Sequence, residues 1–307
     1  MKNITHADKQ FFDMFGFLII RNVLSRPEIK LIEKEYDYGF KKTLEHHSNG
    51  FGMRKQFNWS NLNEMCPNLC SLPYQKNILR IVKKLMSHKI FPYLCNSNNF
   101  NGPATEWHTD QAANTDCFAV KVAFYLDELD ENSGGLRFLP CSHREPLNSD
   151  LWDFGLHGSN EMDIKDYQSK SGLEIDQVPS YYCRTNPGDM VIFNLKIWHS
   201  SLGGGKNRRN ITICYTKYPE IFQTNISSYI FEENRLLSMT PSGWYDVTNF
   251  NSVRYENNFI NNSDFIGYSN YNYSSLNYSS SKIDLIWKDR SGNNNDIATT
   301  NVAVNSK

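Results

Sequence analysis

Between about residue 90 and residue 220 the chain alternates short apolar runs with turn-forming residues, and this pattern constrains the fold more than any other feature. Runs rich in β-branched and aromatic residues are separated by Gly, Pro, Asn and Ser: Phe91–Cys95, Phe118–Leu126, Leu136–Leu139, Met190–Phe193 and Ile211–Tyr215. Runs of this length bounded by turn signals are typical of strands. For so many short strands, an eight-stranded jelly roll of two sheets is one expected solution.

The first 90 residues have a helical pattern instead. Ser25 is a good helix cap, with Glu28 three positions later as the second half of a capping box. Apolar residues then recur at helical spacing as far as Leu44, and again over about 74–86. A short helix and then a strand at about 17–23 are expected before these two helices. Helices first and strands later predict an α+β fold in which helices, mostly from the N-terminal third, cover a β-core.

We expect a single domain over residues 1–290. It comprises a helical cover at about 1–90, the β-core at about 91–220 and a further segment at about 221–290. Beyond Tyr245 the composition shifts toward Asn, Ser and Tyr, which is typical of an irregular surface segment. An ordered flap or a lid over the active site is the alternative. Residues 291–307 are expected to form a flexible tail.

Charge and cysteine usage argue against several classes of protein. Lys and Arg number 32 and Asp and Glu number 33, so the net charge is -1. The chain therefore lacks the excess of basic residues that is typical of a nucleic-acid-binding protein. The most apolar early run, Phe15–Ile20, ends at Arg21 and is too short to span a membrane or to be a signal segment. Seven scattered cysteines argue against a disulfide framework, so we expect an intracellular, cytoplasmic location.

Two histidines and a carboxylate are candidates for a metal site. His108 and Asp110 are two positions apart, so an extended backbone directs both side chains to one side. Such a pair is also common by chance, as a surface histidine beside a turn aspartate. His199 strengthens the case because it lies just past the run Met190–Phe193, where a barrel can present a ligand inward. Two histidines and a carboxylate form the facial triad of non-haem Fe(II) oxygenases.

Two arginines follow shortly after His199. Arg208 and Arg209 stand at the start of a strand-like run, and a guanidinium is a planar fork that matches a carboxylate. Alternation along the strand predicts that they face opposite ways, so one of them is expected to be an ordinary solvated residue. Ser201, two positions after His199, carries a hydroxyl that can share the same anion.

A series of motifs runs through about residues 8–220. It comprises Phe12 with Gly16-Phe17, Trp107-His108-Thr109-Asp110, Tyr125 to Leu136 with its Ser133-Gly134-Gly135, Leu139-Pro140-Cys141-Ser142-His143, Pro187-Gly188-Asp189, Trp198-His199-Ser200-Ser201 and Arg208. In order and spacing the series resembles the phytanoyl-CoA dioxygenase family of Fe(II)- and 2-oxoglutarate-dependent oxygenases. Cys141 stands where the family often has Gly, so that turn is expected to differ.

The resemblance implies a double-stranded β-helix, which is a cupin-like jelly roll, and a set of residue roles. His108, Asp110 and His199 match the iron ligands. Arg208 matches the arginine that binds the distal carboxylate of 2-oxoglutarate, and Ser201 matches a hydroxyl that assists it. Arg209 is the alternative if the register is shifted by one residue.

Further residues are candidates for the pocket, each with a purely structural alternative. Lys121 and Tyr125 share a strand face at i and i+4. Lys121 is assigned to the cosubstrate, and the substrate candidates are Asn96, Asn98, Tyr125, Arg137 and His143.

The resemblance also implies Fe(II), 2-oxoglutarate and O2 as cofactors, with succinate and CO2 as co-products. Hydroxylation of an unactivated C–H bond is the default reaction. Asp110 disfavours halogenation, since related halogenases have Ala or Gly at that position. Oxidative cyclisation or desaturation in natural-product biosynthesis is an alternative, and a non-oxidative metal- or ligand-binding jelly roll is a more remote one. We expect a small-molecule substrate, such as a carboxylic acid or an amino-acid-derived metabolite; the oligomeric state stays open.

Overall fold

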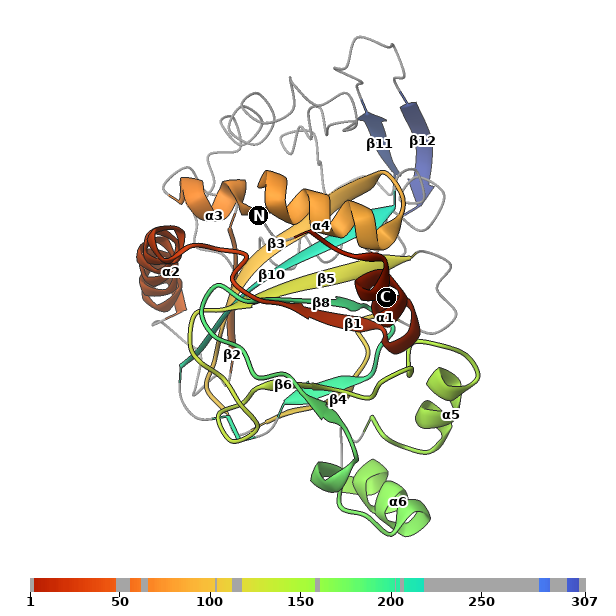
Figure 1. The fold of residues 1–307 in the computed structure, drawn as a ribbon. Helices are drawn as coiled ribbons and strands as arrows, with labels where there is room; N and C mark the ends of the chain where they lie inside the picture. The colour runs from red at the N-terminus through yellow and green to blue at the C-terminus, as the bar shows by residue number, and fades with distance from the viewer. Residues whose placement is uncertain are drawn as a thin grey trace.

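Two antiparallel sheets facing each other form the centre of this computed structural model (Figure 1). The structure describes residues 3–47, 56–61, 66–102, 104–111, 118–157, 161–201, 203–204, 207–217, 282–287 and 297–303. The Asn-, Ser- and Tyr-rich segment predicted beyond Tyr245 lies almost entirely outside these ranges. Within the described part of the chain, no helix is both long and apolar enough to cross a membrane.

The larger sheet has six strands and the smaller has four. In spatial order the larger contains β1 (Phe17–Ile20), β8 (Met190–Asn194), β5 (Ala119–Tyr125), β10 (Arg208–Lys217), β3 (Ile90–Phe100) and β2 (Gln56–Ser60). The smaller contains β4 (Thr105–His108), β9 (His199–Ser201), β6 (Leu136–Phe138) and β7 (Tyr181–Tyr182). Two packed sheets with helices outside them confirm the predicted α+β jelly roll.

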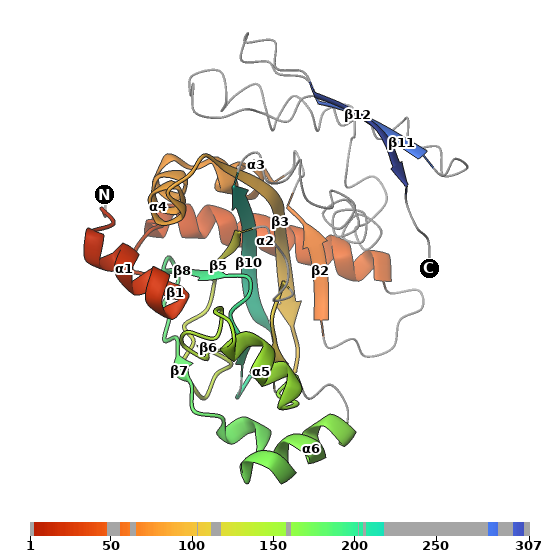
Figure 2. The ribbon, with the colours of Figure 1, turned by 90° about the vertical axis from the view of Figure 1, so that its right-hand side faces the viewer.

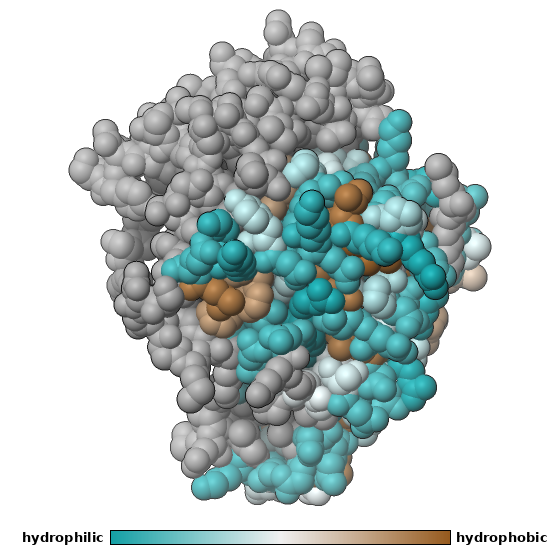
Figure 3. Space-filling view, turned by 90° about the vertical axis from the view of Figure 1, so that its left-hand side faces the viewer, coloured by the Kyte–Doolittle hydropathy of each residue, from teal (hydrophilic) through white to brown (hydrophobic). Residues whose placement is uncertain are grey.

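Helices from the N-terminal third cover the outer face of the six-stranded sheet. They are α1 (His6–Phe15), α2 (Arg26–His47), α3 (Pro67–Ser71) and α4 (Lys76–Met86). The 3-10 turn η1 (Leu72–Tyr74) connects α3 to α4. As predicted, Glu28 accepts hydrogen bonds from the backbone N–H and the hydroxyl of Ser25 at the start of α2. Figure 2 shows α2 running along this side of the sheet. The described part of the face that carries α2 is largely hydrophilic, with small separate hydrophobic areas (Figure 3).

Alternation along β10 sorts its side chains between the helices and the second sheet. Ile211 and Ile213 pack in the hydrophobic cluster that contains α4 residues such as Ile78. Alternate positions on neighbouring strands, Ala123 and Tyr125 among them, pack instead in a cluster with Leu136 and Phe138 of the smaller sheet. Arg208, Asn210 and Thr212 therefore lie on the inner face, between the two sheets.

The outer face of the smaller sheet is covered by the chain between β6 and β7. This stretch forms α5 (Leu147–Asp153), α6 (Glu161–Ser171) and the 3-10 turn η2 (Ile175–Gln177), as Figure 2 shows below the sheets. Trp107 of β4 and Trp198, which precedes β9, pack there with Leu156, Tyr167 and Val178.

Some elements were not expected from the sequence. β3 continues to Phe100, well beyond the predicted end at Cys95, because its Asn- and Ser-rich half still pairs with β10 and β2. Tertiary pairing overrides the low strand propensity of asparagine in this case. At the C-terminal end, β11 (Lys282–Trp287) pairs with β12 (Ile297–Ala303), in a region for which an irregular segment and a flexible tail were expected.

Candidate metal centre and active site

Neighbouring strands of the smaller sheet bring the three predicted metal ligands together. His108 ends β4, His199 begins β9, and the register pairs these two residues directly. Asp110 follows β4, where its backbone N–H donates to the Leu195 carbonyl at 2.9 Å. One ligand atom from each of His108, Asp110 and His199 lies within 4.8 Å of the others.

The histidines are already oriented as ligands. Nδ1 of His108 lies 2.7 Å from the Glu106 carbonyl and Nδ1 of His199 lies 2.9 Å from the Ile197 carbonyl. A carbonyl only accepts, so each Nδ1 carries the proton and each Nε2 offers a lone pair. A partner that fixes the second ring nitrogen is typical of metal-binding histidines.

The unpaired acceptors fit a cation. His199 Nε2 lies 3.4 Å from Asp110 Oδ2, and two acceptors this close repel unless a cation or a proton lies between them. Burial, and then the neighbouring His108, lower the pKa of His199 to about 3, which favours the neutral, metal-binding form. Burial alone would raise the pKa of Asp110, but the Lys121 ammonium and then the two histidines outweigh it and hold that pKa well below its usual range.

Lys121 reaches this carboxylate from the larger sheet. Its Nζ lies 2.7 Å from Asp110 Oδ1, and both side chains are only about one-fifth exposed. The ammonium thus neutralises the carboxylate that a metal would bind. The sequence assigned Lys121 to the cosubstrate, whereas in the structure its ion-pair partner is Asp110, a predicted metal ligand.

We expect Lys121→Met to lower the melting temperature of the metal-free protein and a divalent metal to restore much of the loss. The substitution leaves a largely buried carboxylate without its counter-charge, which costs on the order of 2–3 kcal/mol after allowance for partial exposure. A bound cation then replaces the ammonium as the partner of Asp110. Thermal unfolding with and without Co(II) measures both effects.

Lys9→Met is the matched control, because Lys9 forms an ion pair of the same 2.7 Å length with Asp13 on exposed α1. Its loss should cost only a few tenths of a kcal/mol, with or without metal. A Lys121→Met protein whose stability does not respond to metal any more than that of the wild type would contradict the assignment of Asp110.

Arg208 points to the inner side of the barrel near the metal ligands. Its Nη1 donates to Ser201 Oγ at 2.5 Å and to the Gly134 carbonyl at 2.7 Å. The guanidinium lies over the Phe100 ring at 4.6 Å, is 8% exposed, and among the described residues forms no ion pair with a carboxylate. Its buried Nε has no hydrogen-bond partner in the described chain. A buried, unneutralised guanidinium of this kind fits an anionic ligand.

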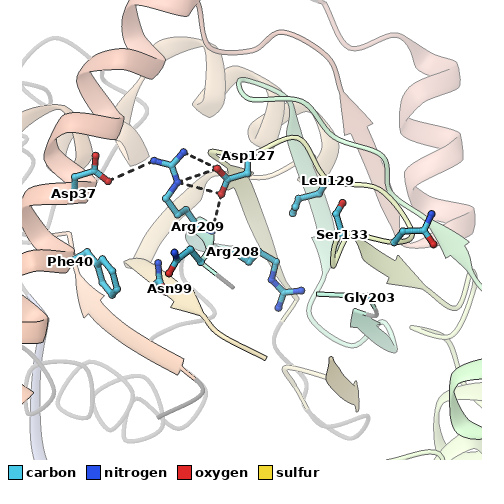
Figure 4. Close-up of a pocket in the computed structure, with 11 residues that line it drawn as sticks. Asp37, Phe40, Asn99, Asp127, Leu129, Ser133, Gly203, Arg208 and Arg209 are labelled. Atoms are coloured by element: carbon cyan, nitrogen blue, oxygen red, sulfur yellow. Dashed lines mark hydrogen bonds and ion pairs between the residues drawn. The ribbon is translucent and has the colours of Figure 1, made fainter. Parts of the chain in front are cut away.

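Arg209 lies on the opposite side of β10, as the alternation predicts. Its Nη2 lies 2.7 Å from Asp127 Oδ1 and 3.4 Å from Glu33 Oε1, and its Nη1 lies 3.7 Å from Asp37 Oδ1. Figure 4 shows Arg209 directed toward Asp37 and Asp127, and Arg208 directed away from them. The outer arginine already has its counter-charges.

A cavity of about 670 Å³ opens at this end of β10 (Figure 4). Its lining comes from α2, from the end of β3 and the start of β10, and from the chain after β5 and before β10: Asp37, Phe40, Asn99, Asp127, Leu129, Asn132, Ser133, Gly203, Asn207, Arg208 and Arg209. None of the three metal ligands is among these residues. The cavity therefore adjoins Arg208 rather than the metal centre itself.

Three of the predicted substrate candidates lie on the inner face of the larger sheet. Asn96 accepts a hydrogen bond from the Thr212 hydroxyl at 2.6 Å, and Asn98 donates to Asn58 Oδ1 at 2.5 Å. Tyr125 pairs across the strands with Asn210, which hydrogen-bonds its phenol. Asn58, Asn210 and Thr212 were not identified from the sequence. Asn210 and Thr212 follow Arg208 by two and four residues, so alternation along the strand could have predicted that they share its face.

The other two candidates lie elsewhere. His143 packs on the end of α1, where a Cβ added at Gly16 would come within 2.5 Å of its Nδ1 and where its Nε2 is 3.3 Å from the Asp13 carbonyl. Arg137 hydrogen-bonds Ser200 on the face of β9 opposite to His199. The structure therefore brings neither side chain to the metal ligands.

Comparisons with known proteins agree with this architecture. The family model described as phytanoyl-CoA dioxygenase (PhyH) matches residues 12–210. HygX from Streptomyces hygroscopicus, crystallised with nickel and 2-oxoglutarate, is 14% identical over 71% of this chain and 88% of its own, with a TM-score of 0.53. EctD from S. alaskensis with bound Fe is 16% identical over 70% and 77%, with a TM-score of 0.52. The α-ketoglutarate-dependent epimerase SnoN from nogalamycin biosynthesis is 14% identical over 69% and 81%, with a TM-score of 0.50. No curated protein matches the sequence.

Proposed function

Since the chain belongs to the phytanoyl-CoA dioxygenase (PhyH) family of 2-oxoglutarate-dependent non-haem iron oxygenases, we propose that it hydroxylates an unactivated C–H bond of a small molecule. Fe(II), 2-oxoglutarate and O2 are the cofactors of this class. His108, Asp110 and His199 are proposed as the iron ligands, and Arg208 with Ser201 as the site for the distal carboxylate of 2-oxoglutarate.

The observation that carries the proposal is the placement of both sites along one strand. His199 and Ser201 lie on the same face of β9, and Ser201 accepts a hydrogen bond from Arg208. Two residues advance about 6.8 Å along a strand, which is on the scale of a five-carbon dicarboxylate. One end of 2-oxoglutarate can therefore meet the metal while the other meets the guanidinium. A non-oxidative binding barrel has no need of this second site.

The residues around the two sites have separable tasks. Iron, 2-oxoglutarate and O2, when bound, supply the oxidising power and yield succinate and CO2. His108, Asp110 and His199 would hold the metal, as the facial triad of this class does. Arg208 and Ser201 orient the cosubstrate. Phe138 and Phe193, with ring centroids 6.1 and 5.0 Å from that of His199, keep water away from this side of the centre.

We further propose that the substrate is an uncharged polar molecule rather than a carboxylic acid. Four cations of the described chain that an acid could use have other partners: Lys121 contacts Asp110, Arg209 contacts Asp127, Arg144 donates to the Asp13 carbonyl, and Arg137 donates to Ser200. The inner wall instead carries asparagine amides, and the buried Oδ1 atoms of Asn98 and Asn210 have no hydrogen-bond partner in the described chain. Neutral hydrogen-bonding side chains suit hydroxyl or amide groups of a ligand.

The first test is spectroscopic. Fe(II) followed by 2-oxoglutarate, added without oxygen, should give a visible metal-to-ligand charge-transfer band. Iron binding without a band would contradict the oxygenase assignment and favour a metal-binding barrel.

The second test concerns the substrate and the reaction. Oxygen is added with a panel of neutral sugars, polyols and amides, each matched with its carboxylic acid, and succinate release is measured. Release stimulated by neutral members supports the substrate class, and release stimulated by acids alone contradicts it. A product with one added oxygen atom indicates hydroxylation. Loss of two hydrogens indicates cyclisation or desaturation instead, and an isomer of unchanged mass indicates epimerisation.

A further inference from the structure

Arg137 is a buried cation whose interactions lie behind the metal centre rather than in it. It occupies the middle of β6, is 2% exposed, and pairs in register with Ser200 of β9. Its neighbours Leu136 and Phe138 face the barrel interior, so its own side chain lies on the outer face of the smaller sheet. A charge buried so deeply is costly unless its polar atoms are satisfied.

The guanidinium contacts both strands that carry the histidine ligands. Its Nε donates to Ser200 Oγ at 3.0 Å, and Ser200 follows His199. Its central carbon lies 4.6 Å from the ring centroid of Trp107, which precedes His108. The Ser200 hydroxyl in turn donates to the Thr105 carbonyl of β4 at 3.0 Å, which links the two strands directly. In a third contact, Nη1 donates to the Asp176 carbonyl at 2.9 Å, which links the guanidinium to the 3-10 turn η2.

We propose that Arg137 is a positioning residue that fixes the distance and orientation of His108 and His199 from the back of the sheet. The inference rests on the proposed metal centre. Adjacent residues in a strand point to opposite faces, so holding Trp107 and Ser200 on the outer face determines where the two imidazoles lie on the inner face. β4 and β9 are short, and their register is irregular between Thr105 and His108. Backbone pairing alone therefore constrains this ligand pair less than a long, regular ladder does, and the guanidinium supplies the missing constraint.

Arg137→Met tests the proposal by keeping side-chain length while removing the hydrogen bonds and the charge. Co(II) is the probe, because its affinity is measured by titration and its visible spectrum reports the coordination geometry. Loss of a residue that orients metal ligands typically weakens metal affinity about 10–100-fold, and we expect a loss in this range together with a changed Co(II) spectrum. Arg137→Lys, which keeps the charge and one donor group, should recover part of the affinity.

Two controls separate positioning from general stability. Ile81→Ala removes buried volume from α4, on the far side of the larger sheet, and should lower the melting temperature without changing Co(II) affinity or spectrum. Arg184→Met removes an exposed arginine paired with Glu131 and should change neither property. If Arg137→Met lowers the melting temperature but binds Co(II) as the wild type does, the residue is only structural and the proposal is wrong.

Ser200→Ala keeps the test decisive if Arg137→Met does not fold. It removes one hydroxyl and should weaken Co(II) binding in the same direction by a smaller factor; unchanged binding contradicts the proposal. A wild-type protein that does not bind Co(II) overturns the metal centre and the positioning role together. If Co(II) binds and depends on Arg137, but Fe(II) gives no charge-transfer band with 2-oxoglutarate, the oxygenase proposal fails and the positioning role stands.

Discussion

His199→Ala should abolish tight metal binding and, with it, all 2-oxoglutarate turnover. The residue supplies one of three ligands, and its imidazole is held ready by the Ile197 carbonyl. Altering a residue that merely supports a ligand costs up to about 100-fold in metal affinity, so removing a ligand itself should cost more than this. Isothermal titration with Co(II), followed by the anaerobic test with Fe(II) and 2-oxoglutarate, measures the loss.

His143→Ala is the matched control, since it removes a histidine that the sequence also offered as a site residue. Its ring packs against α1 and hydrogen-bonds the Asp13 carbonyl, so Co(II) affinity should be that of the wild type. Equal losses in the two variants would contradict the assignment of His199, because a general loss of structure would then explain both.

The proximity of the three proposed metal ligands could be predicted in part from the sequence, because the geometry of two of them is local. His108 and Asp110 lie two residues apart next to a strand, and alternation alone predicts that they share a side. His199 was included because it follows the strand-like run Met190–Phe193, which forms β8 in the structure. The triad therefore depends on backbone periodicity and on one pairing of strands, β4 with β9, that the fold class implies.

The family resemblance matched Arg208 and Ser201 to one carboxylate, with Arg209 as the alternative, but the residue pattern by itself did not choose between the two arginines. Alternation predicted that Arg208 and Arg209 face opposite ways, but it gives no indication of which side is the interior. That choice depends on how β10 lies between β3 and β5, and on the acids of α2 and of the chain after β5 that neutralise Arg209. These are contacts between residues far apart in the chain, which periodicity does not describe.

Arg137 shows a signal that was present and not used. Leu136, Arg137 and Phe138 alternate apolar, charged and apolar, a pattern that places the arginine opposite to the two residues of the interior. Its consideration as a substrate-binding cation rested on its charge alone. Asn58 differs, because Gln56–Ser60 lacks the composition of a strand and becomes β2 only through pairing with the extended β3.

Arg208→Met and Arg209→Met form a pair that tests the proposed cosubstrate site at adjacent positions. For Arg208→Met we expect 2-oxoglutarate affinity to fall about 30- to 3,000-fold, since losing one partner of a buried charge pair costs 2–5 kcal/mol and each 1.4 kcal/mol is a factor of ten. Fe(II) affinity should stay unchanged, because Arg208 contacts Ser201 and none of the three metal ligands. Titration of the charge-transfer band with 2-oxoglutarate measures this affinity.

Arg209→Met should have the opposite profile. Its guanidinium interacts with Asp127, Glu33 and Asp37 outside the barrel and is 24% exposed, so its loss should lower stability by about 1 kcal/mol and leave 2-oxoglutarate affinity unchanged. If instead Arg209→Met loses the cosubstrate and Arg208→Met retains it, the distal carboxylate binds on the outer side of β10, beside Arg209. The cosubstrate could then no longer lie along β9 between His199 and Ser201, and the geometry that links the two proposed sites would be wrong.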